Sequence, residues 1–122
     1  MKNVYAYFRD CKNCGLEIPD FDQFARYNAV EIDPVFVFYD DLGNVNGYER
    51  TDEAEIKLHP YWNVVYSVYL HHDAMHPDNR GFGGAQCVGD FPSLEIAQTF
   101  AAFMDQLLNL ANYIKTTPEK TA

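Results

Sequence analysis

The stretch of sequence that decides the fold is residues 93–115, which read SLEIAQTFAAFMDQLLNLANYIK. Apolar residues recur there at steps of three and four, the spacing that places side chains on one face of an α-helix. Ser93 occupies the N-cap position, and Glu95 and Lys115 suit the helix dipole at the two ends. The predicted apolar face comprises Ile96, Phe100, Phe103, Leu107, Leu110 and Ile114, widened by Ala97, Ala101, Met104, Leu108 and Ala111. Such a face must be covered by a sheet or by a second subunit.

The sequence before this helix predicts strands. Val35–Tyr39 is apolar on both alternating faces, which indicates a strand covered on both sides or central in a sheet. Asn46-Gly47 is a strong type I′ turn signal, so we expect a partner strand from about Tyr48 that continues into the acidic residues 52–55.

Two further strands are expected towards the helix. Residues 62–71 form the longest candidate, and its core face comprises Trp62, Val64, Tyr66, Val68 and Leu70. After a loop from His72 to Gly84, residues 85–91 return as a strand that places Ala85, Cys87, Gly89 and Phe91 on one face.

The N-terminal part adds two short elements. Val4–Phe8 is expected to form a strand, and Asp20 with Gln23 resembles a capping box that starts a helix over Phe21–Ala29. The order of elements predicts the α+β class, with an antiparallel sheet of about four strands, the long C-terminal helix on one face and a short N-terminal helix. We expect a single domain over residues 1–114 and a polar tail over residues 115–122.

The net charge limits the classes of partner. The 122 residues contain 18 Asp plus Glu and 9 Lys plus Arg, a formal charge of −9. Phosphates require cations, so direct binding to nucleic acid or to an anionic membrane is not expected. Three cysteines cannot all pair within one chain, and no apolar run approaches the roughly 18–20 residues of a membrane span. We therefore expect a cytoplasmic protein with reduced thiols.

The spacing of cysteine and histidine residues suggests a zinc site as one interpretation. Cys11 and Cys14 form a C-x-x-C pair followed by glycine, and His72 and His76 have H-x3-H spacing; Cys87 or His71 are alternative ligands. The two halves are far apart in the chain, so the favoured interpretation is that they are ordinary turn and loop residues. We expect no cofactor, with zinc as the alternative.

A catalytic site is not expected. His72, Asp73 and His76 are suitable groups for acid–base chemistry, and a small hydrolase is the enzymatic alternative. No serine elbow, H-E-x-x-H or Walker loop accompanies them. The sequence therefore favours a protein without catalytic residues.

Acidic residues are concentrated around the predicted hairpin. They are Asp40, Asp41, Glu49, Asp52, Glu53 and Glu55, and nearby or exposed rings that can anchor a partner are Tyr39, Tyr48, Tyr61 and Phe82. Clustered negative charge steers a small protein onto a basic surface, such as that of a nucleic-acid-handling protein, whereas dispersed charge only maintains solubility. We expect a non-enzymatic binding protein that blocks a basic partner.

In its general character the chain is short, acidic, aromatic and without a catalytic motif. In this it is similar to inhibitory proteins carried by phages and plasmids, anti-CRISPR proteins among them, and it also resembles bacterial toxin-immunity proteins. The resemblance implies inhibition through protein–protein contact, but it covers no defined motif and transfers no residue's role. The broad apolar face of the C-terminal helix is compatible with a monomer or a homodimer.

Overall fold

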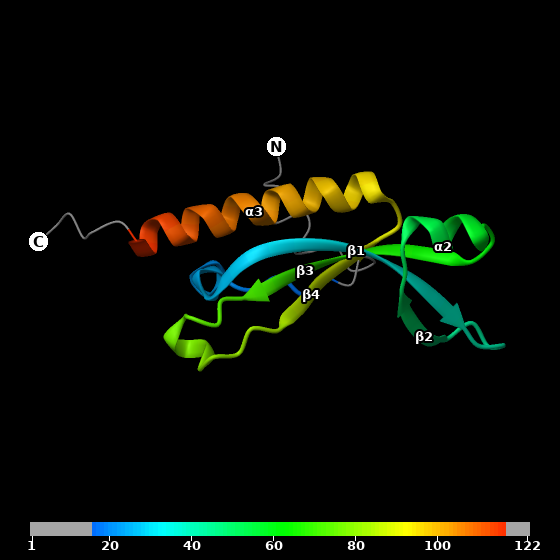
Figure 1. The fold of residues 1–122 in the computed structure, drawn as a ribbon, viewed down its shortest axis with the longest axis horizontal. Helices are drawn as coiled ribbons and strands as arrows, with labels where there is room; N and C mark the ends of the chain where they lie inside the picture. Colours follow the sequence, from blue (N-terminus) through cyan, green and yellow to red (C-terminus); the bar gives the residue numbers. More distant parts are fainter. Residues whose placement is uncertain (1–15, 117–122) are drawn as a thin grey trace, which may run out of the picture.

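The computed structural model describes residues 16–116. Its elements are η1 (Phe21–Arg26), β1 (Tyr27–Tyr39), β2 (Val45–Arg50), α2 (Glu53–Leu58), β3 (Asn63–His72), η2 (Pro77–Asn79), β4 (Ala85–Phe91) and α3 (Leu94–Thr116). The four strands form one antiparallel sheet in the order β2-β1-β3-β4, and α3 lies across one face (Figure 1). The predicted α+β class is confirmed. The predicted strand Val4–Phe8 and the last six residues of the predicted tail lie outside the described residues.

The C-terminal helix begins where the sequence predicts, because the Ser93 hydroxyl accepts a hydrogen bond of 3.2 Å from the backbone N–H of Ile96. Its buried stripe is Ala97, Phe100, Met104, Leu108 and Ala111. Ile96, Leu110 and Ile114 are exposed instead. The predicted face was therefore centred wrongly: the residues taken to widen it form its middle, because the sheet covers only one narrow stripe of the helix.

The short N-terminal helix is a 3-10 helix that ends at Arg26, three residues before the predicted end. Tyr27 pairs with His72 at the start of β1. Residues 27–29, which the helical spacing placed in the helix, therefore belong to the sheet. The side chain of Asp20 makes no capping hydrogen bond, and the capping-box prediction is wrong. Phe24 is buried as expected, whereas Phe21 is 41% exposed.

The turn between β1 and β2 lies earlier than predicted. The Asp40 carboxylate accepts hydrogen bonds of 2.9 Å from the backbone N–H groups of Leu42 and Asn44, and Gly43 adopts a φ of +81°. Asn46 and Gly47 lie inside β2, where Gly47 pairs with Phe38. The type I′ turn at Asn46-Gly47 was therefore wrong, because the side chain of Asp40 fixes a turn before it.

A short helix, α2, follows β2 where the sequence predicted a continued strand. The Asp52 carboxylate caps this helix by accepting a hydrogen bond of 2.9 Å from the backbone N–H of Glu55. Behind it, four rings pack together in a satellite aromatic cluster, which comprises Phe36, Phe38, His59 and Trp62. The rings of His59 and Trp62 stack with centroids 3.6 Å apart, so this cluster attaches α2 to the end of the sheet.

A β-bulge in β4 decides which side chains reach each face of the sheet. Gly89 lies opposite Val68 and Cys87 lies opposite Tyr69, so Val88 is an extra residue in β4. Val88 and Phe91 are buried in the main core beneath α3, whereas Cys87 lines a hollow on the opposite face. The predicted common face for Cys87 and Phe91 was therefore wrong. A Cβ at Gly89 would lie 2.7 Å from Leu16 Cδ2 and 3.0 Å from the Phe91 ring, so any larger residue there would have to displace these side chains.

Candidate functional site

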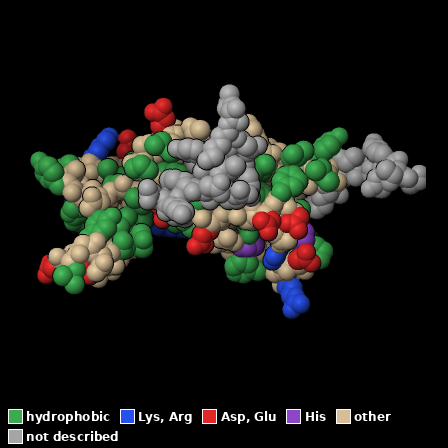
Figure 2. Space-filling model, turned by 180° about the vertical axis from the view of Figure 1, so that it is seen from behind, with side chains coloured by type: hydrophobic (Ala, Val, Ile, Leu, Met, Phe, Trp, Pro, Cys, Tyr) green, Lys and Arg blue, Asp and Glu red, His purple; other side chains and the backbone are tan. Residues whose placement is uncertain are grey.

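Large apolar side chains are exposed at one end of the molecule, which we call the hairpin end (residues 39–62). They are Tyr39, Leu42, Val45, Tyr48, Leu58, Tyr61 and Trp62. Tyr61 is 95% exposed and Leu42 is 86% exposed. Figure 1 shows β2 and α2 projecting beyond the body of the sheet, and Figure 2 shows hydrophobic side chains over this projection with acidic groups at its tip. Exposed apolar groups gathered in this way are typical of interaction surfaces.

All six predicted acidic residues belong to the hairpin end, but they serve different purposes. Asp40 holds the β1–β2 turn and Asp52 caps α2. The Glu53 carboxylate lies 3.7 Å from Lys57 Nζ, one helical turn further along. The Glu55 carboxylate lies 3.7 Å from His59 Nε2 in the same way.

Asp41 and Glu49 are exposed and have no charged partner among the described residues. Because Asp40 and Asp52 stabilise local structure, removing their charges would disturb the fold of the hairpin end. The groups best placed to act on a partner are therefore Asp41 and Glu49, with Glu53 and Glu55 as weakly paired neighbours.

The structure brings Tyr39, Tyr48 and Tyr61 to the hairpin end but does not bring Phe82 there. Phe82 lies in the β3–β4 loop, where the centre of its ring is 4.9 Å from the centre of the His72 ring. His72 pairs with Tyr27, the first residue of β1, whereas the hairpin end begins at Tyr39, the last residue of β1. These ends of a 13-residue strand are roughly 40 Å apart. Phe82 is 56% exposed and cannot belong to the same surface.

The predicted zinc ligands fall into two groups. Cys11 and Cys14 lie outside the described residues. His72 Nδ1 donates a hydrogen bond of 2.9 Å to the carbonyl of Gly84, and His76 Nδ1 accepts one of 3.1 Å from the backbone N–H of Asp78. Within residues 16–116, no three His, Cys, Asp or Glu side chains are grouped to hold a metal. Zinc binding through the two cysteines stays a prediction.

The residues of the hydrolase alternative organise the β3–β4 loop. The Asp73 carboxylate accepts a hydrogen bond of 2.9 Å from the backbone N–H of Met75. The nearby Asn79 is buried and its amide donates 2.8 Å hydrogen bonds to the carbonyls of Arg26 and Asp73. Each of these contacts has a local structural role, and the expectation of a non-catalytic protein stays a prediction.

The face of the sheet opposite α3, which we call the open face, carries a row of polar side chains, of which the sequence singled out only His71 and Cys87, as alternative zinc ligands. They are Glu31, Asp33, Ser67, Tyr69, His71, Cys87 and Asp90, and they alternate with core residues along β1, β3 and β4. His71 Nε2 lies 2.8 Å from Glu31 Oε1. A polar row of this kind is not needed to build the core, which lies on the other face.

Asp33 and Arg50 form the charged centre of this row. Arg50 Nη1 lies 3.4 Å from Asp33 Oδ2, and the guanidinium carbon lies 5.0 Å from the centre of the Tyr69 ring. Burial, reinforced by the neighbouring Glu31, raises the pKa of Asp33 above its usual value, while Arg50 opposes that rise. The open face thus binds one guanidinium group within the chain itself.

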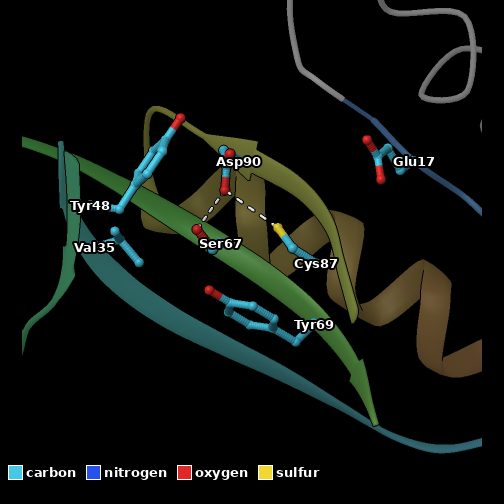
Figure 3. A pocket seen from close by; sticks show the side chains of 7 residues that line it. All are labelled: Glu17, Val35, Tyr48, Ser67, Tyr69, Cys87 and Asp90. Carbon is cyan, nitrogen blue, oxygen red and sulfur yellow. Dashed lines mark hydrogen bonds between the residues drawn. The ribbon is translucent and has the colours of Figure 1, made fainter. Parts of the chain in front are cut away.

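Beside this row is a pocket of about 400 Å³ (Figure 3). It is lined by Glu17, Val35, Tyr48, Ser67, Tyr69, Cys87 and Asp90. The Ser67 hydroxyl donates a hydrogen bond of 2.5 Å to Asp90 Oδ1, and the Cys87 thiol donates a weaker one of 3.6 Å to the same atom. The single thiol hydrogen also has the Gly89 carbonyl within reach at 3.7 Å, so the Ser67 hydroxyl is the contact that fixes the orientation of the Asp90 carboxylate.

The Cys87 thiol is not an activated nucleophile. Burial, with the negative charge of Asp90 as the next cause, raises the pKa of Cys87 to about 11. The thiol is therefore protonated at neutral pH, and it acts in the pocket as a hydrogen-bond donor.

Sequence reasoning missed Ser67, Tyr69, Asp90 and Glu17 as site residues. The alternation in residues 62–71 did place Ser67 and Tyr69 on the mixed second face, which was a usable signal. Asp90 and Cys87 gave no such signal, because only the bulge in β4 turns both of them to the open face.

Comparisons with known proteins identify no relative: no family model, curated protein or solved structure matches this chain. Within the part of the chain that the structure describes, no helix has both the length and the apolar character that a bilayer crossing demands.

Proposed function

We propose that this protein is a non-enzymatic binding protein that docks its hairpin end onto a basic surface of another protein. The observation that supports the proposal is the coincidence of seven exposed apolar side chains with six acidic residues in one projecting part of the fold. Aromatic anchors with a charged rim are the composition of specific protein interfaces. Tyr48 and Tyr61 are the proposed anchors, and Asp41 and Glu49 provide steering charge.

The proposed partner class is a protein whose basic surface handles nucleic acid. Such a surface carries the cations that complement a chain of charge −9. Docking there would compete with nucleic acid for the same cations, which is the means of inhibition that we propose.

The test compares two variants of equal net charge. The docking variant carries Asp41→Asn, Glu49→Gln and Glu53→Gln, and spares the turn and cap formed by Asp40 and Asp52. The control variant carries Asp22→Asn, Asp78→Asn and Asp105→Asn, which lie outside the hairpin end. Partners captured from the native host are quantified by mass spectrometry and confirmed with the purified partner by surface plasmon resonance.

We expect the docking variant to associate at least about tenfold more slowly with a basic partner, while the control variant retains the rate of the wild type. Raising the salt concentration should slow the wild type towards the docking variant, because it screens the same charges. Equal capture by both variants, or equal loss in both, would remove the hairpin end as the docking surface.

A further inference from the structure

The open-face pocket has the chemistry of a cation site. Two carboxylates, Glu17 and Asp90, and two phenol rings, Tyr48 and Tyr69, line it, and none of its described lining residues is basic. Carboxylate oxygens accept hydrogen bonds from a cation, and the faces of aromatic rings attract positive charge. Its volume of about 400 Å³ falls within the usual range for pockets that hold small groups.

The Asp90 carboxylate is oriented so that it can bind such a cation. Ser67 and Cys87 both donate to Oδ1 of its carboxylate, and no described residue donates to Oδ2. Ser67 is buried, and its short, partly buried hydrogen bond restricts the carboxylate to one orientation. Figure 3 shows Asp90 above Ser67, with Tyr48 on one side and Cys87 on the other. One carboxylate oxygen thus accepts from Ser67, while within residues 16–116 the second accepts no hydrogen bond and can receive one from a ligand.

A guanidinium group matches this arrangement better than an ammonium group. The chain itself gives an example on the same face, where the Arg50 guanidinium lies over the Tyr69 ring and beside the Asp33 carboxylate. The pocket adds a second tyrosine ring, Tyr48, and a second aspartate, Asp90, beside the Tyr69 ring on which Arg50 lies. A planar guanidinium can stack on a ring while its N–H groups reach a carboxylate, which a compact ammonium cannot do as well.

We infer that this pocket binds the guanidinium group of one arginine side chain from the basic partner. The identity of the donor rests on the proposed function, because a basic protein surface supplies the arginine. Tyr48 belongs both to the pocket and to the hairpin end, so one partner can contact both. The hairpin end then provides the broad contact, and the pocket holds one specific side chain.

The test is an NMR titration of the full-length protein with two small probes. N-acetyl-arginine amide carries the guanidinium, and N-acetyl-citrulline amide has nearly the same shape without the charge. We expect the arginine probe to shift the backbone signals of Ser67, Tyr69, Cys87 and Asp90 in a saturable way, and the citrulline probe to leave them in place.

Variants then assign the binding to the proposed groups. Asp90→Asn keeps the shape of the side chain and an acceptor for Ser67, so the fold should persist while affinity for the arginine probe falls at least about tenfold. Tyr48→Leu should weaken binding as well, because it removes the pocket ring on which Arg50 does not already lie. Asp105→Asn, on α3, is the control for net charge and should bind as the wild type does.

Equal shifts with both probes, or arginine-induced shifts that Asp90→Asn leaves unchanged, would overturn the inference. Non-saturable shifts spread over all acidic residues would also overturn it, since they indicate only nonspecific attraction. These results are independent of the partner experiment. If the docking variant lost its partner and the arginine probe did not bind the pocket, the proposed function would be supported and the inference about the pocket would be refuted.

Discussion

At the scale of single residues, Asp90 and Cys87 show how neighbours set the chemistry of a group. The two side chains lie on the same bulged strand and share a hydrogen bond on the open face. The pKa of Cys87 rises to about 11, first because of burial and then because of the adjacent carboxylate. A thiolate next to Asp90 would be both poorly solvated and repelled, so the proton stays on sulfur.

We predict that Asp90→Asn lowers the pKa of Cys87 from about 11 towards its usual value near 9. The measurement is the rate of alkylation by iodoacetamide as a function of pH, followed at Cys87 by peptide mass spectrometry. Because each pKa unit changes the thiolate fraction about tenfold, alkylation of the wild type at pH 8 should be much slower than that of the urea-unfolded chain. An unchanged pH profile in the variant would show that Asp90 does not influence the thiol.

The same shift links stability to pH. The folded pKa of Cys87 lies above the unfolded value, so the folded protein holds this proton more tightly. Its stabilising contribution is complete below about pH 9 and is lost as the pH rises to about 11. The free energy of unfolding should therefore fall across that window, and Cys87→Ser should reduce the fall.

At the scale of elements, the β1–β2 turn depends on Gly43 and not on Gly47. Gly43 has a φ of +81°, whereas Gly47 lies within β2, and a Cβ at either position would meet no atom within 4 Å. The two positions differ only in backbone conformation and so form a matched pair.

Gly43→Ala should lower the free energy of unfolding by about 1 kcal/mol, because alanine is strained at positive φ. Gly47→Ala should leave it unchanged or raise it by a few tenths of a kcal/mol, because a strand accepts alanine and the unfolded chain loses freedom. Urea denaturation measures both. If Gly47→Ala proved the more damaging substitution, the turn would lie at Asn46-Gly47 after all.

Elements with strong periodicity were predictable from the sequence. The ends of α3, the span of β4 and the buried face of β3 at Val68 and Leu70 agree with the structure, because each depends on local spacing or capping. The turn at Asp40 and the helix capped by Asp52 were missed, since an aspartate followed by polar residues suits a turn, a cap or a loop equally.

The candidate site shows the same division between local and distant causes. Tyr39, Tyr48 and Tyr61 are exposed at the hairpin end, where their neighbours in the sequence had suggested an interaction surface. The pocket was not predictable, because it combines side chains from all four strands and from the segment before η1. Its composition depends on strand order and on a bulge, and neither leaves a clear pattern in one sequence.

At the scale of the whole molecule, the fold has two unequal apolar clusters. The main core joins α3, η1, β1, β3 and β4 and contains the fully buried Phe24, Phe91, Phe100 and Met104. In the described chain, no residue of that core comes from the hairpin end. The hairpin end is held instead by the satellite aromatic cluster, in which Trp62 is 44% exposed.

This division predicts two levels of stability. Phe100→Ala should lower the global free energy of unfolding by about 3–5 kcal/mol, because it empties space in the main core. Trp62→Ala should chiefly accelerate amide hydrogen exchange in β2 and α2, and leave exchange in β3 and β4 near the wild-type rate. Uniform acceleration across the sheet would show that the hairpin end unfolds only with the rest of the molecule.

The extra residue in β4 has a consequence for how this strand tolerates change. Cys87 and Phe91 are four positions apart, so a regular strand would point both to the same side. Deleting Val88 would restore regular pairing and leave Cys87 and Asp90 on the open face and Phe91 in the core, but it would remove a fully buried side chain of the main core. The extra residue therefore adds core volume without changing the face of its neighbours, and its loss should leave a cavity beneath α3.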